Sequence, residues 1–243
     1  MSRTAAALII GNEILSGKIQ ETNLVELARV LRGLGIDLKR VVVVTDEPTT
    51  IAKEVTALAS THDFVFTSGG VGPTHDDVTM VGVASAFNVP VVPHPTLEDM
   101  LRHHFGERIN ENHLRLALVP QGARLLSKPD SLWPVTVIEN VWILPGIPEV
   151  FRKKLDIARE HLVGDSPFLS RAVYTMLDEA DLAPLLNEVV LRHPSVDVGS
   201  YPAWNDRKYR TKLTFDGKDS AAIGRAVDAF LALLPEGEPQ WTE

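Results

Sequence analysis

The chain has 243 residues, which is long enough to bury a full hydrophobic core in one large domain or in a larger and a smaller one. Hydrophobic residues make up 44% of the sequence and charged residues 23%, and these proportions exclude a disordered or collagen-like chain. The formal net charge is −8 and Lys and Arg form no dense run, so binding along a nucleic-acid backbone is not supported.

The absence of cysteine excludes disulfides and thiolate metal sites. The amino-terminal apolar stretch is short and has one basic residue before it, so it does not match a secretory signal peptide. No uncharged apolar run reaches the roughly 18 residues that a membrane span needs. We therefore expect a cytoplasmic protein with no membrane partner.

In chain order, residues 4–10 form an apolar run that ends at Gly11 and predicts a strand buried on both faces. Leucines at helical spacing follow, with Asn23 as the expected cap and Gly35 as the end of the helix. The valine-rich stretch 39–45 is typical of a central strand.

Apolar residues in 51–59 then fall on one helical face, and residues 63–67 predict a third strand. A glycine-rich turn follows directly and leads into a helix over 78–87, which we expect Asp76 or Asp77 to cap. Strand and helix thus alternate, which predicts a three-layer α/β domain with a mostly parallel sheet. Ligands of such sheets bind beyond the carboxyl ends of the strands.

Residues 93–118 are predicted to be mostly helical, with Thr96 and Asp99 as a capping pair. Two short strands, 135–138 and 141–144, are expected to form a tight hairpin. Pro148 then opens a helix that continues to about residue 162.

Small and turn-forming residues in 163–167 predict a linker between two domains, 1–165 and 168–243. Beyond the linker the pattern is strand, helix, strand, strand, helix. The segments are 171–177, 181–192, 196–201, 209–215 and 220–234. This order predicts a small α+β domain of βαββα type.

The glycine-rich turn carries the strongest indication of chemistry. Gly69, Gly70 and Gly72 leave out Cβ atoms where the chain turns from a strand into a helix, so backbone N–H groups can approach a phosphate closely. The glycines could also serve the turn alone, but polar groups crowd the same segment, namely Thr74, Asp76, Asp77 and Thr79. This crowding favours a phosphate site.

Two common phosphate-binding motifs do not fit the turn. The Walker motif needs Gly-Lys-Ser/Thr where this chain has Gly72-Pro73-Thr74. A dinucleotide-binding motif that starts at Gly70 needs glycine or alanine at His75. Neither motif therefore explains the turn.

Carboxylates follow all three predicted strands. Asp76 and Asp77 are adjacent, so one can cap the helix while the other faces a ligand, and carboxylates beside a pyrophosphate suit Mg²⁺. Asp46, just past the second strand, is a third candidate carboxylate or equally a plain turn residue. Glu13, after the first strand, could accept a hydrogen bond from a ligand ring N–H or hydroxyl.

At these residues the chain resembles the molybdopterin-binding domain family, in the branch of competence-damage-inducible protein A. The resembling stretches are 9–17, Asn23, 45–47, 68–79 and 144–148. Residues 131–134, 140–148, 199–204 and 209–215 are also similar to the amino-terminal region of eukaryotic-type FAD synthase. The resemblance implies a molybdopterin-binding fold followed by a small α+β domain.

The resemblance also implies roles for individual residues. Asp46 and Asp77 match acidic positions that serve catalysis and metal binding in the pterin-adenylating branch. The positions expected to bind the ligand or its phosphate are Gly11, Glu13, Gly17, Asn23, Ser68, Gly69, Gly70, Gly72, Pro73, Thr74, Thr79, Pro145 and Gly146.

Three functional hypotheses follow. In the first, Mg²⁺, Mn²⁺ or Co²⁺ held by Asp77 with Asp46 or Asp76 activates water to cleave FAD or ADP-ribose. In the second, the chain binds or adenylates molybdopterin and cleaves no nucleotide, and under either hypothesis we expect a homo-oligomer. In the third, the carboxy-terminal domain binds RNA as a KH domain does, but residues 171–234 contain no Gly-x-x-Gly loop.

Overall fold

The computed structural model describes residues 2–129, 131–204 and 207–243. The chain divides into two compact units, Met1–Asp165 and Ser166–Glu243. The division falls within the stretch 163–167. Among the described residues, none of the helices combines the length and the apolar character that a membrane crossing requires.

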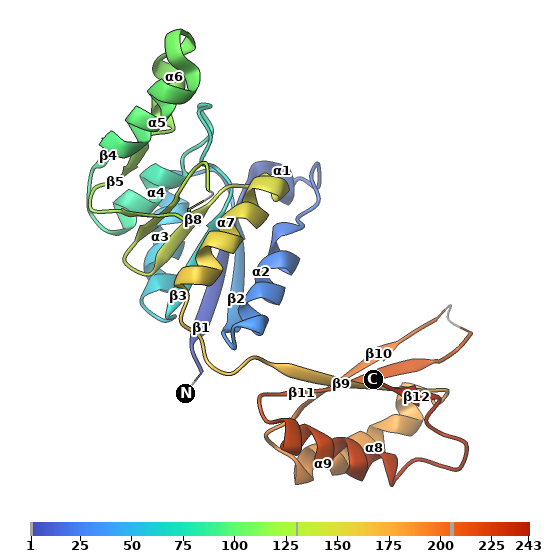
Figure 1. Cartoon of the computed structure of the whole chain (residues 1–243). Coiled ribbons are helices and arrows are strands. Elements are labelled where there is room, and N and C mark those ends of the chain that lie inside the picture. Colours follow the sequence, from blue (N-terminus) through green and yellow to red (C-terminus); the bar gives the residue numbers. More distant parts are fainter. Residues whose placement is uncertain (1, 130, 205–206) are drawn as a thin grey trace. The chain divides into compact units, whose positions relative to one another are not determined.

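The first unit is built around one six-stranded sheet (Figure 1). Its strands, in spatial order, are β2 (Asp37–Val44), β1 (Thr4–Ile10), β3 (Phe64–Ser68), β8 (Val141–Leu144), β7 (Val135–Ile138) and β6 (Arg124–Leu126). The first four strands are parallel, and β7 and β6 run antiparallel to their neighbours. The predicted mostly parallel sheet and the hairpin of β7 and β8 are confirmed.

Helices cover both faces of this sheet. On one face, Ala7 and Ile9 of β1 pack with buried residues of α2 (Asn23–Gly33) and α7 (Pro148–His161). On the other face, Leu8 packs with α3 (Pro48–Ala59) and α4 (Thr79–Ala86). A further short helix, α1 (Asn12–Leu15), follows β1. The predicted three-layer α/β architecture is therefore confirmed.

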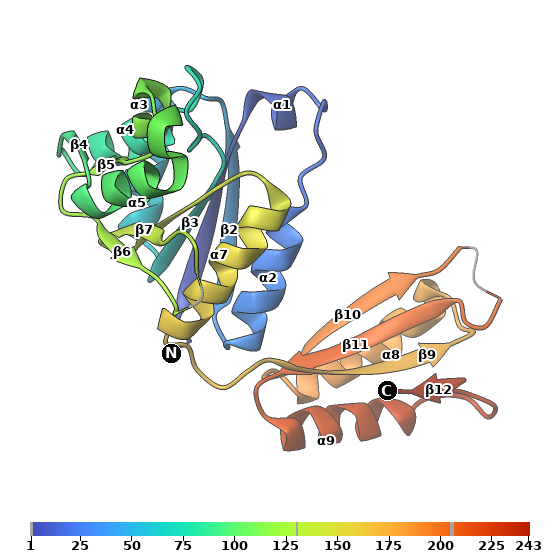
Figure 2. The same ribbon diagram turned by 45° about the horizontal axis from the view of Figure 1, so that its top comes forward.

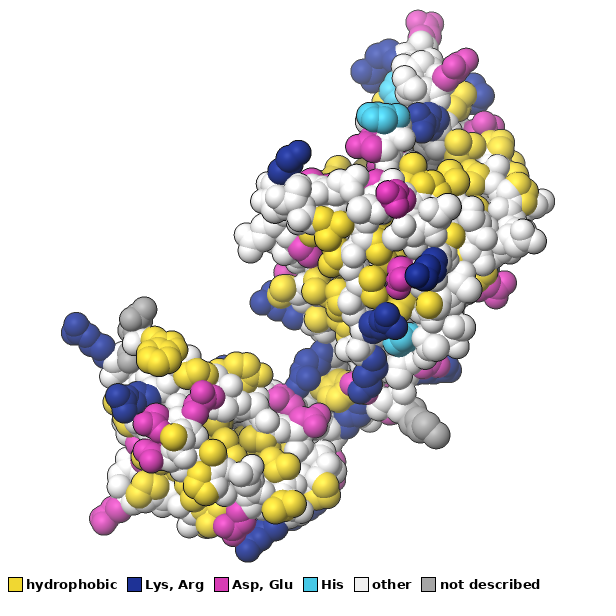
Figure 3. Space-filling model, turned by 180° about the vertical axis from the view of Figure 1, so that it is seen from behind, with side chains coloured by type: hydrophobic (Ala, Val, Ile, Leu, Met, Phe, Trp, Pro, Cys, Tyr) yellow, Lys and Arg dark blue, Asp and Glu magenta, His cyan; other side chains and the backbone are white. Residues whose placement is uncertain are grey.

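The prediction that 39–45 is a central strand is wrong. β2 lies at the edge of the sheet, and Val41 and Val43 are 40% and 39% exposed. A run of β-branched residues favours a strand in either place, because it fits any pleated surface. Exposed hydrophobic side chains are found in patches on both units, as the space-filling view shows (Figure 3).

Residues 93–118 contain the expected helices, α5 (Pro95–Phe105), η1 (Gly106–Arg108) and α6 (Glu111–Arg115), flanked by β4 (Val91–Pro93) and β5 (Leu118–Pro120). The expected cap of Thr96 and Asp99 is wrong. α5 begins at Pro95, and its N-cap His94, two residues before Thr96, makes no side-chain capping bond. Proline at the first helical position sets the start instead.

Two other predicted caps are also wrong. Asn23 is the first residue of α2 rather than its cap, and the carboxylate of Glu21 accepts the Leu24 N–H at 2.7 Å. Neither Asp76 nor Asp77 caps α4, which begins at Thr79 after the N-cap residue Val78. In both places the polar side chain that was expected at the helix end is bonded within the site instead.

The second unit is a four-stranded sheet with two helices (Figure 2). Its strand order is β10 (Asp197–Pro202), β11 (Thr211–Gly217), β9 (Leu169–Thr175) and β12 (Trp241–Thr242). The core of this unit includes residues of α8 (Glu179–Arg192) and α9 (Ser220–Leu231). The βαββα order is as expected, and β12 adds a two-residue strand too short to show a period in the sequence.

Candidate functional site

Four strand ends meet at one edge of the first unit's sheet. β2, β1, β3 and β8 are parallel neighbours, so the residues that follow Val44, Ile10, Ser68 and Leu144 leave the sheet at the same edge. The glycine turn and Asp46 therefore lie on the same side of this unit, each next to the loop that follows β1.

The loop after β1 is tied to the end of β2. Gly11 N–H donates to the carbonyl oxygen of Val44 at 3.1 Å, and Asn12 N–H donates to Asp46 Oδ2 at 2.8 Å. One oxygen of Asp46 thus positions the start of α1. Glu13 follows in α1, and its carboxylate lies where a Cβ at Gly11 would be, 2.6 Å from Oε1.

The glycine turn needs its glycines for two reasons. Gly69 and Gly70 have φ values of 108° and 64°, in the region that other residues rarely adopt. A Cβ on Gly69 would also collide with the carbonyl oxygen of Ile10. Thr79 closes the turn, since its hydroxyl donates to Gly69 O at 2.8 Å and its N–H to Gly70 O at 2.9 Å.

The turn leaves backbone donors without partners. The N–H groups of Gly70, Val71 and Gly72 donate no hydrogen bond to any residue that the structure describes. Successive free N–H groups in a tight turn form an anion-binding concavity. The local geometry is therefore suited to a phosphate group.

Two carboxylates converge on the hydroxyl of Thr74. Its Oγ1 lies 2.6 Å from Asp76 Oδ1 and 2.5 Å from Asp77 Oδ2, and its N–H also donates to Asp77 Oδ2 at 2.8 Å. The hydrogen bond from Thr74 lowers the pKa of the exposed Asp76 carboxyl, with help from the Asp76 N–H. One hydroxyl has a single proton, so it cannot satisfy both carboxylates.

Asn23 joins α2 to two of the strand-end segments. Its Nδ2 donates to Ser68 Oγ at 3.0 Å and to the carbonyl oxygen of Gly146 at 2.8 Å. Gly146 in turn approaches the glycine turn closely, since a Cβ there would lie 3.3 Å from Gly69 Cα. Asn23 is only 3% exposed, so it is a buried link between α2, β3 and the loop after β8.

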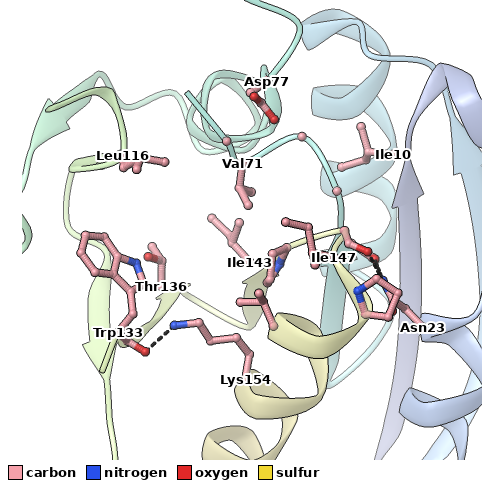
Figure 4. A pocket seen from close by; sticks show the side chains of 18 of the residues that line it. Ile10, Asn23, Val71, Asp77, Leu116, Trp133, Thr136, Ile143, Ile147 and Lys154 are labelled. Atoms are coloured by element: carbon pink, nitrogen blue, oxygen red, sulfur yellow. Dashed lines mark hydrogen bonds between the residues drawn. The ribbon is translucent and has the colours of Figure 1, made fainter. Parts of the chain in front are cut away.

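These segments border a cavity of about 1060 Å³ (Figure 4). The predicted site residues that line it are Glu13, Asn23, Ser68, Gly69, Gly70, Gly72, Pro73, Asp77, Pro145 and Gly146. Gly11, Gly17, Asp46, Thr74, Asp76 and Thr79 do not line it. Of these, Thr74 and Asp76 are bonded to each other beside Asp77, and Asp46 supports the loop after β1.

The cavity also has a wall that the sequence interpretation missed. It includes Trp133, Thr136 and Lys154, together with residues of α5 such as His104. Lys154 lies three residues after buried Phe151, so helical spacing alone places it on the inner face of α7. A charged residue on the inner face of a helix is a pattern from which this wall of the cavity could have been predicted.

Lys154 is a buried basic residue. Only 6% of the residue is exposed, and its Nζ donates to the carbonyl oxygens of Trp133 and Pro134, the latter at 2.6 Å. Burial lowers the pKa of the Lys154 amine to about 7. No Asp or Glu in the described part of the chain forms an ion pair with it.

A preformed metal centre is not present among residues 2–129, 131–204 and 207–243, because no group of three or more His, Asp or Glu side chains is arranged to hold an ion. Asp76 and Asp77 nevertheless point oxygens at one hydroxyl that cannot satisfy both. A divalent ion with few protein ligands, completed by water and ligand oxygens, fits such a pair.

Taken together, the fold and the cavity define an α/β protein with a small-molecule pocket at the carboxyl edge of a parallel sheet. The family model described as "Probable molybdopterin binding domain" matches residues 6–163, and the model described as "FAD synthase, middle domain" matches residues 167–242. The chain belongs to the molybdopterin-binding domain family, and its second unit is of the FAD synthase middle-domain type.

Some relatives match nearly the whole chain. "Probable FAD synthase" of Caenorhabditis briggsae is 33% identical across 96% of this chain and 50% of its own length. A protein of Archaeoglobus fulgidus is 31% identical across 93% of this chain and 95% of its own length. The crystal structure of CinA from Thermoplasma acidophilum, described as of unknown function, has a TM-score of 0.60 and 27% identity, covering 66% of this chain and 98% of its own.

The predicted resemblance to FAD synthase and competence-type proteins is therefore confirmed. The chain spans about half the length of the FAD synthase relatives that it matches.

Proposed function

We propose that the chain binds a nucleotide or pterin that carries a phosphate, and that it hydrolyses a pyrophosphate of FAD or ADP-ribose type with a divalent metal. The observation that supports this most is the glycine turn, where three successive N–H groups without a described partner border the same cavity as Asp77. The relatives named as FAD synthases make a flavin nucleotide a reasonable ligand class.

In this proposal the turn binds and orients the pyrophosphate. The N–H groups of Gly70, Val71 and Gly72 donate to phosphate oxygens, and rigid donors of this kind stabilise charge that develops in the transition state. Asn23 and Thr79 do not touch the ligand's phosphate; they hold the turn through Ser68, Gly146 and Gly69.

The acidic residues supply the metal site. Asp77 would hold a Mg, Mn or Co ion together with Asp76 or Asp46, and one oxygen of Asp46 is already engaged by Asn12 N–H. When bound, the ion would polarise the phosphoryl group and lower the pKa of a water molecule. Asp77 fits this role best because it alone of the three lines the cavity.

A second candidate is a molybdopterin-binding or adenylating protein without hydrolase activity. The family match over residues 6–163 favours it. The two candidate functions differ in whether AMP is released. Incubation of the purified chain with FAD or ADP-ribose and each metal should release AMP if the chain is a hydrolase. Binding of molybdopterin with no AMP released under any metal would favour the second candidate.

We also propose that the chain forms a homo-oligomer through β2. This strand is an open edge of the sheet, and two of its valines, Val41 and Val43, are about 40% exposed. Unpaired edge strands readily pair with another chain. Sedimentation analysis should show a dimer or larger assembly for the wild type and a smaller species for Val43→Lys, and a monomeric wild type would contradict the proposal.

A further inference from the structure

The cavity has a second polar end, away from the glycine turn. Figure 4 shows Val71 and Asp77 on one side and Lys154 with Trp133 and Thr136 on the other, with Ile143 and Ile147 between them. The intervening wall is apolar. A ligand whose phosphate lies at the glycine turn would therefore place a different group at Lys154.

Lys154 retains hydrogen-bonding capacity at this end. An ammonium group has three donors, and two carbonyl oxygens, those of Trp133 and Pro134, receive bonds from it. The hydroxyl of Thr136 makes no hydrogen bond with any described residue. One cationic donor and one hydroxyl thus border an apolar space next to the indole of Trp133.

These donors suit a carbonyl oxygen better than a phosphate. A phosphate needs several donors for its oxygens, as the glycine turn offers, and would be poorly solvated among apolar side chains. A ring carbonyl needs only one or two donors, and the flat ring that carries it can stack on the Trp133 indole. Adenine has no carbonyl, so this end would distinguish ring types.

We propose that Lys154 and Thr136 bind the carbonyl-bearing edge of a flat heteroaromatic ring, of flavin or pterin type, whose phosphate end lies at the glycine turn. The inference rests on the proposed function for the placement of the phosphate but not for its hydrolysis. Lys154 is then the residue that makes the cavity specific for carbonyl-bearing rings over adenine.

Other ionisable groups surround the cavity and must be separated from Lys154 in any test. Those that line it are Glu13, Glu21, Asp77, His103 and His104. Of the elements that pack on α7, β7 has no ionisable residue; those of β6 and α2 are Arg124, Glu26, Arg29 and Arg32. None of these forms an ion pair with Lys154, so its substitution changes the charge without breaking a salt bridge.

The test compares two ligands that share an ADP half, FAD and ADP-ribose, by calorimetric titration below pH 7, where the Lys154 amine is protonated, and without metal so that no cleavage occurs. For Lys154→Met we expect FAD affinity to fall about tenfold or more, since a charged hydrogen bond is lost, and ADP-ribose affinity to stay the same. The matched control is Lys153→Met, because Lys153 is the exposed neighbour on the same helix. It should change neither affinity.

A second variant tests the proposal even if Lys154→Met fails to fold. Thr136→Val keeps the shape of the side chain and both carbonyl bonds of Lys154, and it should weaken FAD alone by a smaller factor. The flavin absorption band should shift on binding to the wild type and shift less with either variant. Equal losses for FAD and ADP-ribose, or no loss for FAD, would overturn the proposal, whether or not the chain hydrolyses either ligand.

Discussion

Thr74 holds Asp77 at one oxygen: its backbone N–H donates to Asp77 Oδ2 at 2.8 Å, and its hydroxyl oxygen lies 2.5 Å from the same atom. This pair closes the segment between the glycine turn and α4 and presents the Asp77 carboxylate to the cavity. Because the same hydroxyl also contacts Asp76, the two acidic residues are coupled through Thr74.

The contact between Thr74 and Asp76 predicts that a change at Thr74 alters the pKa of the Asp76 carboxyl. Thr74→Val removes the hydroxyl that contributes most to the lowered pKa of Asp76, so this pKa should rise toward 3.8. The backbone bond from Thr74 N–H to Asp77 does not need the hydroxyl and should survive. Carbon-detected NMR titration of the Asp76 carboxyl measures the shift, and Thr74→Ser should leave it in place. An unchanged Asp76 titration in the valine variant would remove Thr74 as the cause.

Substitutions can separate the two constraints on the glycines, which are positive φ and the lack of space for a Cβ atom. Gly17 and Gly69 both have positive φ, but a Cβ on Gly17 meets no atom within 4 Å, whereas a Cβ on Gly69 meets the carbonyl oxygen of Ile10. Gly17→Ala should lower the free energy of unfolding by about 1–2 kcal/mol, the cost of left-handed backbone. Gly69→Ala should cost distinctly more in urea unfolding. Equal costs would show that the contact with Ile10 relaxes freely.

Asn23 should be important for stability rather than for phosphate contact. Asn23→Ala removes two hydrogen bonds and leaves the buried hydroxyl of Ser68 and the partly buried carbonyl of Gly146 each with one donor fewer, so the free energy of unfolding should fall by about 2–4 kcal/mol. Asn12→Ala, at an exposed position next to the same site, should cost under about 0.5 kcal/mol. Chemical unfolding of both variants checks this, and similar losses for the two would count against the buried link.

Burial of Lys154 predicts a pH dependence of stability. The pKa of its amine is about 7 in the folded chain and 10.5 when unperturbed, so between these values the unfolded chain binds more protons. Stability should therefore rise with pH over this window, relative to Lys154→Met, by at most about 1.4 kcal/mol per pH unit. The hydrogen bonds from Lys154 to the two carbonyl oxygens favour the protonated amine, so they reduce the slope of stability against pH. A flat difference in unfolding free energy across about pH 7–10 would contradict the assignment.

Much of the fold follows from local patterns in the sequence. The apolar runs that became β1 and β3, each followed by a turn and a helix, are sufficient to predict a parallel sheet and a shared edge for Gly11 and the glycine turn. The hairpin at Glu139 follows from two short runs joined by two residues. These features depend on residues close together in the chain.

The remaining features depend on distant contacts. A run of valines is compatible with an edge strand and with a central strand. The edge position of β2 therefore depends on which strands pair with β1 and β3. Asn23 could have capped a helix, but its amide bonds Ser68 and Gly146, which are far away in the sequence. Lys154 was missed as well, although its spacing from Phe151 is a local pattern that places it on the inner face of α7.

The proposed hydrolysis is tested most directly by the metal-dependent release of AMP from FAD and ADP-ribose by Asp77→Asn, compared with Asp99→Asn at an exposed position of α5 outside the cavity lining. The substitution keeps the shape of the side chain but removes its charge. We expect Asp77→Asn to lose activity by about a hundredfold or more, the scale of a lost electrostatic catalytic group, and Asp99→Asn to match the wild type. Equal rates for the wild type and both variants would contradict this expectation.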